Sequence, residues 1–110
     1  METLKKLENN GVYLDYNDLV RLCEKYKLSE LSVFGSSIRN DFNKDSDVDF
    51  LVSFINYFKN NPFDIIYLEE DFSKLLNRKV DIVCKEGLRN QIRREEILST
   101  REIIYVYKQA

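Results

Sequence analysis

Residues 33–52 read VFGSSIRNDFNKDSDVDFLV and contain a polar segment between two apolar runs. The first run, residues 31–34, ends at Gly35 and predicts a short buried strand. The second run, residues 49–54 (DFLVSF), alternates little between polar and apolar residues, which predicts a strand covered on both faces. We therefore expect Gly35 to follow one strand directly and a pair of aspartates to begin the next.

That pair is Asp47 and Asp49, which are separated by one residue. Side chains alternate along an extended chain, so both carboxylates are expected on the same face. Two converging carboxylates suit Mg²⁺, which commonly binds one or two protein carboxylates together with substrate phosphates. A pair of aspartates in an acidic chain is also common in solvated loops and helix caps, so the pair is informative only together with its neighbours.

A third carboxylate, Asp81, interrupts the apolar run of residues 79–84 (KVDIVC). A charge in a buried strand is costly unless it is paired or bound to a metal. Asp81 could pair with Arg78 or Lys79 at a sheet edge. If its strand lies beside residues 49–54, however, three carboxylates face one site and can hold two divalent ions. Such an ion pair stabilises the attacking and leaving oxygens in phosphoryl or nucleotidyl transfer.

The turn after the first strand carries groups suited to phosphate. Gly35 allows close approach of the backbone, and the Ser36 hydroxyl and nearby N–H groups can bind phosphate oxygens. Arg39 follows at a spacing that permits a further phosphate contact. A Gly-Ser pair alone is most often an ordinary turn. Followed by ten residues and an Asp-x-Asp pair, between two apolar strands, it indicates a nucleotide and metal site.

Composition excludes several other classes of chemistry. The chain has 110 residues, with 17 Lys and Arg, 19 Asp and Glu, and no histidine. Histidine-based acid–base catalysis and histidine-ligated metals are therefore excluded, and the absence of a basic excess argues against nucleic acid as a direct partner. The length predicts a single domain over residues 1–110.

The two cysteines, Cys23 and Cys84, lie far apart within apolar stretches and indicate packed thiols in a reducing compartment. The first ten residues, METLKKLENN, lack the apolar run of a signal peptide. No window is long and apolar enough for a transmembrane helix, so no membrane partner is expected. We expect a cytoplasmic protein.

Periodicity predicts helices and strands in the order α-α-β-β-α-β-α-β. The remaining expected elements are a helix over residues 2–9, a helix capped by Asp15, a helix opened by Asn61-Pro62, a strand over 79–84, a helix over 88–97 and an edge strand over 103–107. This order predicts an α/β (α+β) fold with a small mixed β-sheet backed by helices.

Two surface features have alternative interpretations. The last strand presents Tyr105 and Tyr107 on one face, which could contact a helical partner. The arginines Arg89, Arg93 and Arg94 are expected to lie on a solvated helix face rather than in an interface.

The spacing Gly35-Ser36, ten residues, Asp47-x-Asp49 resembles the signature of the nucleotidyltransferase superfamily related to DNA polymerase beta. The segment KVDIVCKEGL resembles the strand that carries the third carboxylate of that superfamily. The short chain is similar to the minimal nucleotidyltransferases (MNT), antitoxin partners of HEPN-domain ribonuclease toxins. The resemblance spans roughly residues 17–107 and leaves residues 1–14 as an N-terminal extension.

The resemblance implies a polymerase beta-like fold and specific roles for the motif residues. The implied nucleotide-binding residues are Gly35, Ser36, Ser37 and Arg39. The implied catalytic and metal-binding residues are Asp47, Asp49 and Asp81. Asp47 and Asp49 would bind both of two Mg²⁺ ions, and Asp81 would bind the catalytic ion and help to deprotonate the acceptor hydroxyl. Asn40 stands where the family often has glycine, and asparagine tolerates the left-handed conformation that such a turn requires.

The resemblance also implies a function. A type VII-like antitoxin of this kind transfers AMP from ATP to a tyrosine of its HEPN toxin and can assemble with that toxin into an oligomer. Two alternatives stay open. The domain could neutralise a partner by masking its surface without catalysis, or it could transfer a nucleotide to RNA or a small molecule.

Overall fold

The computed structural model describes residues 1–108, and its elements follow the predicted order. The helices are α1 (Glu2–Asn9), α2 (Tyr16–Lys25), α3 (Asp64–Leu76) and α4 (Gln91–Thr100). The strands are β1 (Leu28–Phe34), β2 (Val48–Phe54), β3 (Val80–Cys84) and β4 (Glu102–Val106). Short 3₁₀ turns cover Gly35–Ile38, Tyr57–Lys59 and Lys85–Gly87.

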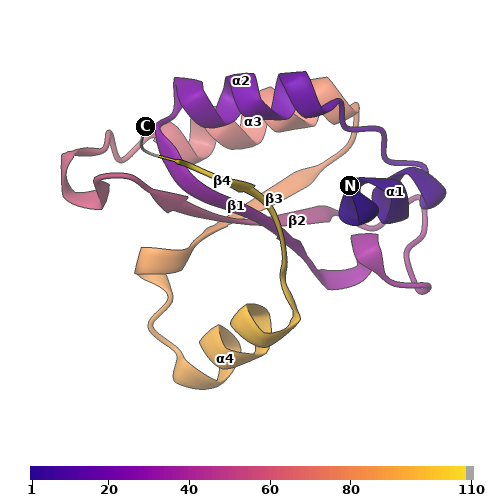
Figure 1. Cartoon of the computed structure of the whole chain (residues 1–110). Helices are drawn as coiled ribbons and strands as arrows, with labels where there is room; N and C mark the ends of the chain where they lie inside the picture. The colour runs from indigo at the N-terminus through magenta and orange to yellow at the C-terminus, as the bar shows by residue number, and fades with distance from the viewer. Residues whose placement is uncertain (109–110) are drawn as a thin grey trace.

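The four strands form one mixed sheet in the order β3-β2-β1-β4. β1 is antiparallel to both β2 and β4, whereas β2 and β3 are parallel. A parallel pair needs a crossover connection, which α3 provides. Helices α2 and α3 cover one face of the sheet and α4 lies on the other side (Figure 1). The predicted mixed sheet backed by helices, with β4 at an edge, is confirmed.

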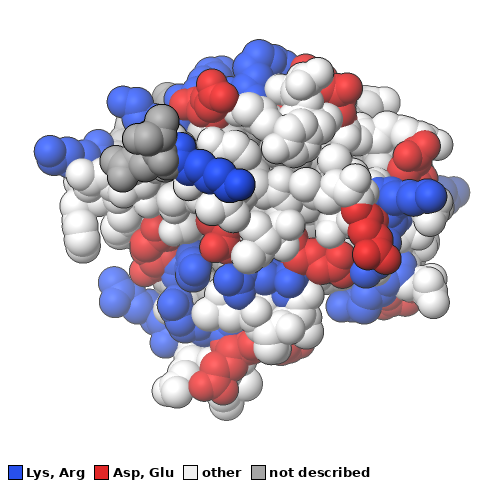
Figure 2. All heavy atoms as spheres, in the orientation of Figure 1, with Lys and Arg blue, Asp and Glu red and all other residues white. Residues whose placement is uncertain are grey.

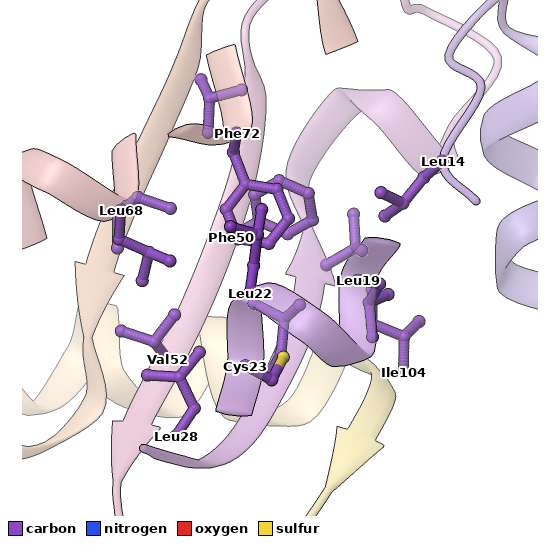
Figure 3. Close-up of a cluster of buried hydrophobic side chains, with 14 of the residues drawn as sticks. Leu14, Leu19, Leu22, Cys23, Leu28, Phe50, Val52, Leu68, Phe72 and Ile104 are labelled. Carbon is purple, nitrogen blue, oxygen red and sulfur yellow. The ribbon is translucent and has the colours of Figure 1, made fainter. Parts of the chain in front are cut away.

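The core lies between the sheet and the layer formed by α2 and α3. The Phe50 ring from β2 meets the Phe72 ring from α3 at a centroid distance of 4.7 Å, and both side chains are fully buried (Figure 3). Burial of each such side chain contributes about 1.5–3 kcal/mol. Asp15 caps α2 as predicted, since its carboxylate accepts the N–H groups of Asn17 and Asp18 at 2.9 and 3.2 Å. The residues that α2 buries are Leu19, Leu22 and Cys23.

Two predicted helix boundaries were wrong. Helix α3 begins at Asp64 rather than at the Asn61-Pro62 pair, because the side chain and carbonyl of Asn61 accept the N–H groups of Phe63 and Asp64, each at 2.9 Å, and form a separate turn. Helix α4 runs over Gln91–Thr100 rather than 88–97, because Asn90 caps it by accepting the N–H of Arg93 at 2.9 Å.

The strands differ from prediction mainly in length. β1 begins at Leu28, three residues before the predicted strand, and β2 begins at Val48. β4 ends at Val106, so Tyr107 lies beyond the strand that was expected to include it. Both cysteines are free thiols, but only Cys23 is buried in the core, and Cys84 at the end of β3 is half-buried beside Glu86. Within residues 1–108, no helix combines the length and the apolar character needed to cross a membrane.

The N-terminal helix packs against the rest of the fold at two places. The Asn10 side-chain amide donates to the carbonyls of Ser37 and Arg39 at 2.8 and 3.0 Å. Thr3 and Lys6 bind the Glu102 carboxylate of β4 at 2.8 and 2.9 Å. Residues 1–14 therefore support the 3₁₀ turn Gly35–Ile38 directly.

Helix α4 is attached to the opposite face of the sheet by polar contacts. Arg94 donates to the Lys85 carbonyl at 2.9 Å, and Arg101 donates to the Glu30 carboxylate at 3.0 Å. Lys85 approaches the other Glu30 oxygen at 3.6 Å. The Glu30 and Arg101 side chains are only 16% and 18% exposed, so this ion pair is shielded from solvent. These contacts fix the position of α4 beneath the sheet.

We predict that Asn10→Ala lowers the free energy of unfolding by about 1–2 kcal/mol, because two hydrogen bonds of about 1 kcal/mol each are lost. Urea denaturation followed by circular dichroism measures this change. Asn9→Ala is the matched control, since Asn9 is exposed and its side chain makes no hydrogen bond within residues 1–108. Equal losses in the two variants would contradict the proposed support of the turn.

Candidate functional site

Strands β2 and β3 bring Asp49 and Asp81 side by side. The parallel register pairs Asp49 with Asp81 directly. Their neighbours Val48, Phe50 and Val80 are buried in the core, so the alternation of side chains directs both carboxylates to the opposite face. That face is the one on which α4 lies (Figure 1). The predicted pairing of these two strands is confirmed.

The turn that follows β1 lies against the Asp49 carboxylate. The β1–β2 register places Phe34 opposite Asp49, so Gly35 comes next to this side chain. A Cβ atom built on Gly35 would lie 2.5 Å from Asp49 Oδ2, and the φ angle of Gly35 is +81°. Glycine is therefore required here for two reasons, namely its backbone conformation and the space taken by the carboxylate.

Asp47 flanks this pair rather than converging with it. It precedes β2, is half-buried, and its Oδ2 lies 3.7 Å from Lys79 Nζ. Within residues 1–108, no three carboxylate or thiol groups form a ready-made metal cage. Repulsion between carboxylates and attraction to Lys79 explain why the third side chain turns aside. The two-residue spacing brings Asp47 close enough for its charge to act on Asp49.

The environment of Asp49 is unusually negative. Partial burial, followed by the charges of Asp81 and Asp47, raises the pKa of the Asp49 carboxyl to about 6. The positive charges of Arg39 and Arg93 oppose this shift of the pKa but do not cancel it. Hard divalent cations bind carboxylate oxygens and relieve such repulsion. The donor chemistry of Asp47, Asp49 and Asp81 therefore fits Mg²⁺.

The predicted nucleotide-binding residues occupy the turn with different exposures. Ser36 is half-buried, whereas Ser37 is fully buried and its hydroxyl finds no hydrogen-bond partner within residues 1–108. The Ser37 side chain therefore does not reach the surface of the turn. Arg39 is exposed and binds the Asp41 carboxylate at 3.1 Å, a contact that the sequence reading missed.

Sequence reasoning also missed the contribution of α4. A pocket of about 190 Å³ lies between the turn and this helix, and its lining includes Gly35, Arg39, Arg93 and Glu96. Arg93 was expected on a solvated face, and it is exposed, but it also lines this pocket. The spacing of Arg93, Glu96, Ile97 and Thr100 was the available signal, because residues three and four apart share one helix face.

The expected partner surface at the C-terminal strand is only partly formed. Tyr105 is half-buried and Tyr107 is exposed, and both line a separate pocket of about 610 Å³ on the side of α2. This pocket shares no residue with the one between the turn and α4. The aromatic residues of β4 therefore do not contribute to the carboxylate site.

Comparisons with known proteins agree on one family. A family profile described as a nucleotidyltransferase domain matches residues 19–109. The protein adenylyltransferase MntA of Thermococcus cleftensis is 39% identical over 85 residues, which are 77% of this chain and 81% of that protein. A solved toxin–antitoxin structure with AMP-PNP has a TM-score of 0.70 at 18% identity, over 86% of this chain and 76% of that one.

A second solved structure contains a tri-AMPylated HEPN toxin of Shewanella oneidensis in complex with its MNT antitoxin. Its TM-score is 0.62 at 16% identity, over 92% of this chain and 73% of that one. At these identities, the likeness to the two solved structures shows a shared fold.

We predict that Gly35→Ala lowers the free energy of unfolding by about 2–3 kcal/mol, combining about 1 kcal/mol of left-handed backbone strain with a clash against Asp49. Gly11→Ala is the matched control, because Gly11 has the same φ of +81° with nothing near the added Cβ. Thermal and urea unfolding measure both variants. In an Asp49→Ala background the cost of Gly35→Ala should fall to that of the control, and an unchanged cost would contradict the clash.

We predict that Asp49→Asn stabilises the metal-free protein at pH 8 by about 1 kcal/mol, less than the raised pKa alone would give, because the site is partly solvated. The folded-state pKa of about 6 exceeds the unfolded value near 3.8, so the folded state binds more protons between these values. Stability of the native chain therefore falls as pH rises through this window.

Urea unfolding at pH 4 and pH 8 tests the direction of this change in stability, and Asp45→Asn at an exposed position is the control. The difference between Asp49→Asn and the native chain should shrink towards pH 4. If Asp49→Asn is less stable than the native chain at pH 8, the charged Asp49 carboxylate does not destabilise the fold, which would contradict the prediction.

Proposed function

Because this chain belongs to the nucleotidyltransferase domain family, we propose that it is a Mg²⁺-dependent protein adenylyltransferase that acts as an antitoxin. Its reaction transfers AMP from ATP to a tyrosine of a cognate HEPN-domain ribonuclease toxin and so neutralises the toxin. The observation that carries this proposal is the pairing of Asp49 with Asp81 across β2 and β3, directly beside the Gly35 turn.

The relatives support the adenylyl transfer and the toxin–antitoxin parts of this proposal. The Thermococcus cleftensis relative is named as a protein adenylyltransferase. The structural neighbours include a toxin–antitoxin complex with an ATP analogue and one with an AMPylated HEPN toxin. The same arrangement of sheet and helices is present here, together with all three motif aspartates. A cytoplasmic location follows from the need for ATP and fits the two free cysteines.

In this mechanism, Asp47, Asp49 and Asp81 would hold the metal ions, and Gly35, Ser36 and Arg39 would bind the phosphates of ATP. Bound Mg²⁺ supplies charge neutralisation and polarises the phosphoryl group. The acceptor oxygen forms a bond to the α-phosphorus, the bond from that phosphorus to the bridging oxygen breaks, and pyrophosphate leaves with the electron pair. The exposed Asp81 carboxylate helps to remove the proton of the acceptor hydroxyl.

The exposure of Asp81 favours a protein acceptor. Because this carboxylate lies at the surface, a tyrosine on a docked protein can approach it. Acidic and basic side chains are interspersed on the face shown in Figure 2, without the continuous basic surface that an RNA acceptor favours. The chain's balance of 17 basic and 19 acidic residues agrees with this view.

We predict that α-labelled ATP with Mg²⁺ labels a protein band when this protein is incubated in a lysate of its source organism. Asp47→Asn combined with Asp49→Asn should reduce labelling by at least about 100-fold, because the metal ligands are lost. Asp45→Asn, outside the site, should label normally. γ-Labelled ATP should give no labelling that depends on the added protein, because the γ-phosphate leaves within pyrophosphate. Phosphorimaging after nuclease treatment measures the transfer to protein.

The outcomes separate the alternatives. Labelling that persists undiminished in the double variant would contradict the site assignment. Label found in RNA or in a small molecule would replace the protein acceptor. Protection of cells from the toxin by the double variant, without any label, would favour neutralisation by masking.

A further inference from the structure

The pocket between the turn and α4 is too small for a whole nucleotide. Its volume is about 190 Å³, whereas pockets for complete small ligands measure roughly 300–1,000 Å³. Gly35 and Arg39 line it from the turn, and Arg93 and Thr100 line it from α4. Since Gly35 also touches the Asp49 carboxylate, the pocket adjoins the metal-binding carboxylates. It therefore suits only the part of a substrate that lies next to the metals.

Arg93 differs from the other arginines around this site. Arg39 is paired with Asp41, Arg94 donates to a carbonyl, and Arg101 is paired with Glu30. The Arg93 guanidinium makes no hydrogen bond and no ion pair within the described chain, residues 1–108. All of its donors are free to bind a ligand, and a guanidinium matches the geometry of phosphate oxygens.

Arg93 brings an unpaired positive charge to this pocket. Its guanidinium lines the pocket from α4, and no carboxylate within residues 1–108 forms an ion pair with it. Glu96 also lines the pocket, and Arg39 is paired with Asp41, so among the lining cations Arg93 alone has no ion pair within residues 1–108.

The position of Arg93 is fixed by its helix. Ile97, one turn further along α4, is buried, and Asn90 caps the helix by accepting the N–H of Arg93 itself. The Arg94 and Arg101 contacts hold the same helix to the sheet. The helix therefore fixes the Arg93 backbone beside the pocket, and only the side chain has to become ordered when a ligand binds.

We propose that Arg93 is a nucleotide-binding residue whose guanidinium holds the phosphate groups that leave as pyrophosphate, from the side of the pocket opposite Gly35. This inference rests on the proposed nucleotidyl transfer. When the bond between the α-phosphorus and the bridging oxygen breaks, the electron pair stays on pyrophosphate. The guanidinium stabilises that added negative charge, so it contributes both to binding and to the departure of pyrophosphate.

The test is calorimetric titration of Arg93→Gln, Arg93→Lys and the native chain, in Mg²⁺, with AMP-PNP, inorganic tripolyphosphate and AMP. Arg93→Gln should weaken AMP-PNP and tripolyphosphate binding by about 10- to 100-fold, the range expected for a hydrogen bond to a charged group. AMP binding should change by less than about twofold, because AMP lacks the leaving phosphates, and Arg93→Lys should be intermediate. Arg89→Gln is the matched control, since Arg89 is exposed and is absent from the pocket lining.

Each outcome decides the inference. Native affinity of Arg93→Gln for tripolyphosphate would overturn it. An equal loss of AMP and tripolyphosphate binding, with a lowered unfolding temperature, would show a structural role and would also overturn it. Tripolyphosphate binding that depends on Arg93, in a native chain that transfers no AMP, would support this site and contradict the proposed function.

Discussion

The parallel pairing of β2 with β3 is the constraint on which the candidate site depends. It sets Asp49 directly beside Asp81. Parallel neighbours cannot be joined by a tight turn, so the chain must cross over the sheet, and α3 makes that crossing. The contact between Phe50 and Phe72 anchors α3 to the strand that carries Asp49. Core packing on one face of the sheet thus determines where the carboxylates stand on the other.

This arrangement opposes stability at the site itself. Partial burial, followed by the charges of Asp81 and Asp47, raises the pKa of Asp49 to about 6, so at neutral pH the charged carboxylate costs the folded chain free energy that the unfolded chain does not lose. Gly35 adds a second cost, because glycine loses more conformational freedom on folding than any other residue. The hydrophobic contacts of α2 and α3 offset both costs. A bound cation would remove the cost of the charged Asp49 carboxylate. Cation binding at this site would therefore stabilise the pairing of β2 with β3.

Some residues of the candidate site can be identified from the sequence immediately around them, whereas others depend on packing between distant segments. Asp49 and Asp81 could be assigned from sequence because each interrupts an apolar strand, and strand alternation fixes the face of a side chain. Gly35 could be assigned because it ends β1. Ser37 could not be separated from Ser36, since burial of its side chain depends on packing of the whole turn. The boundaries of α3 and α4 depend on the side chains of Asn61 and Asn90. An asparagine in the same local sequence can cap a helix, form a turn or face solvent, so the sequence alone does not fix these boundaries.

Contacts between distant segments explain what the sequence could not reveal. Asn10 reaches the carbonyls of Ser37 and Arg39, and nothing in the spacing of these residues indicates that they meet. Arg93 lines the pocket because α4 is held to the sheet, in part by the ion pair of Arg101 with Glu30 on β1. The turn is therefore supported from one side by α1 and faced from the other by α4. Such support suits the proposed binding of phosphate, since a loop that moves freely would lose much of its binding free energy in becoming ordered. The short central motif supplies the chemistry, and the two flanking helices supply the rigidity that the chemistry requires.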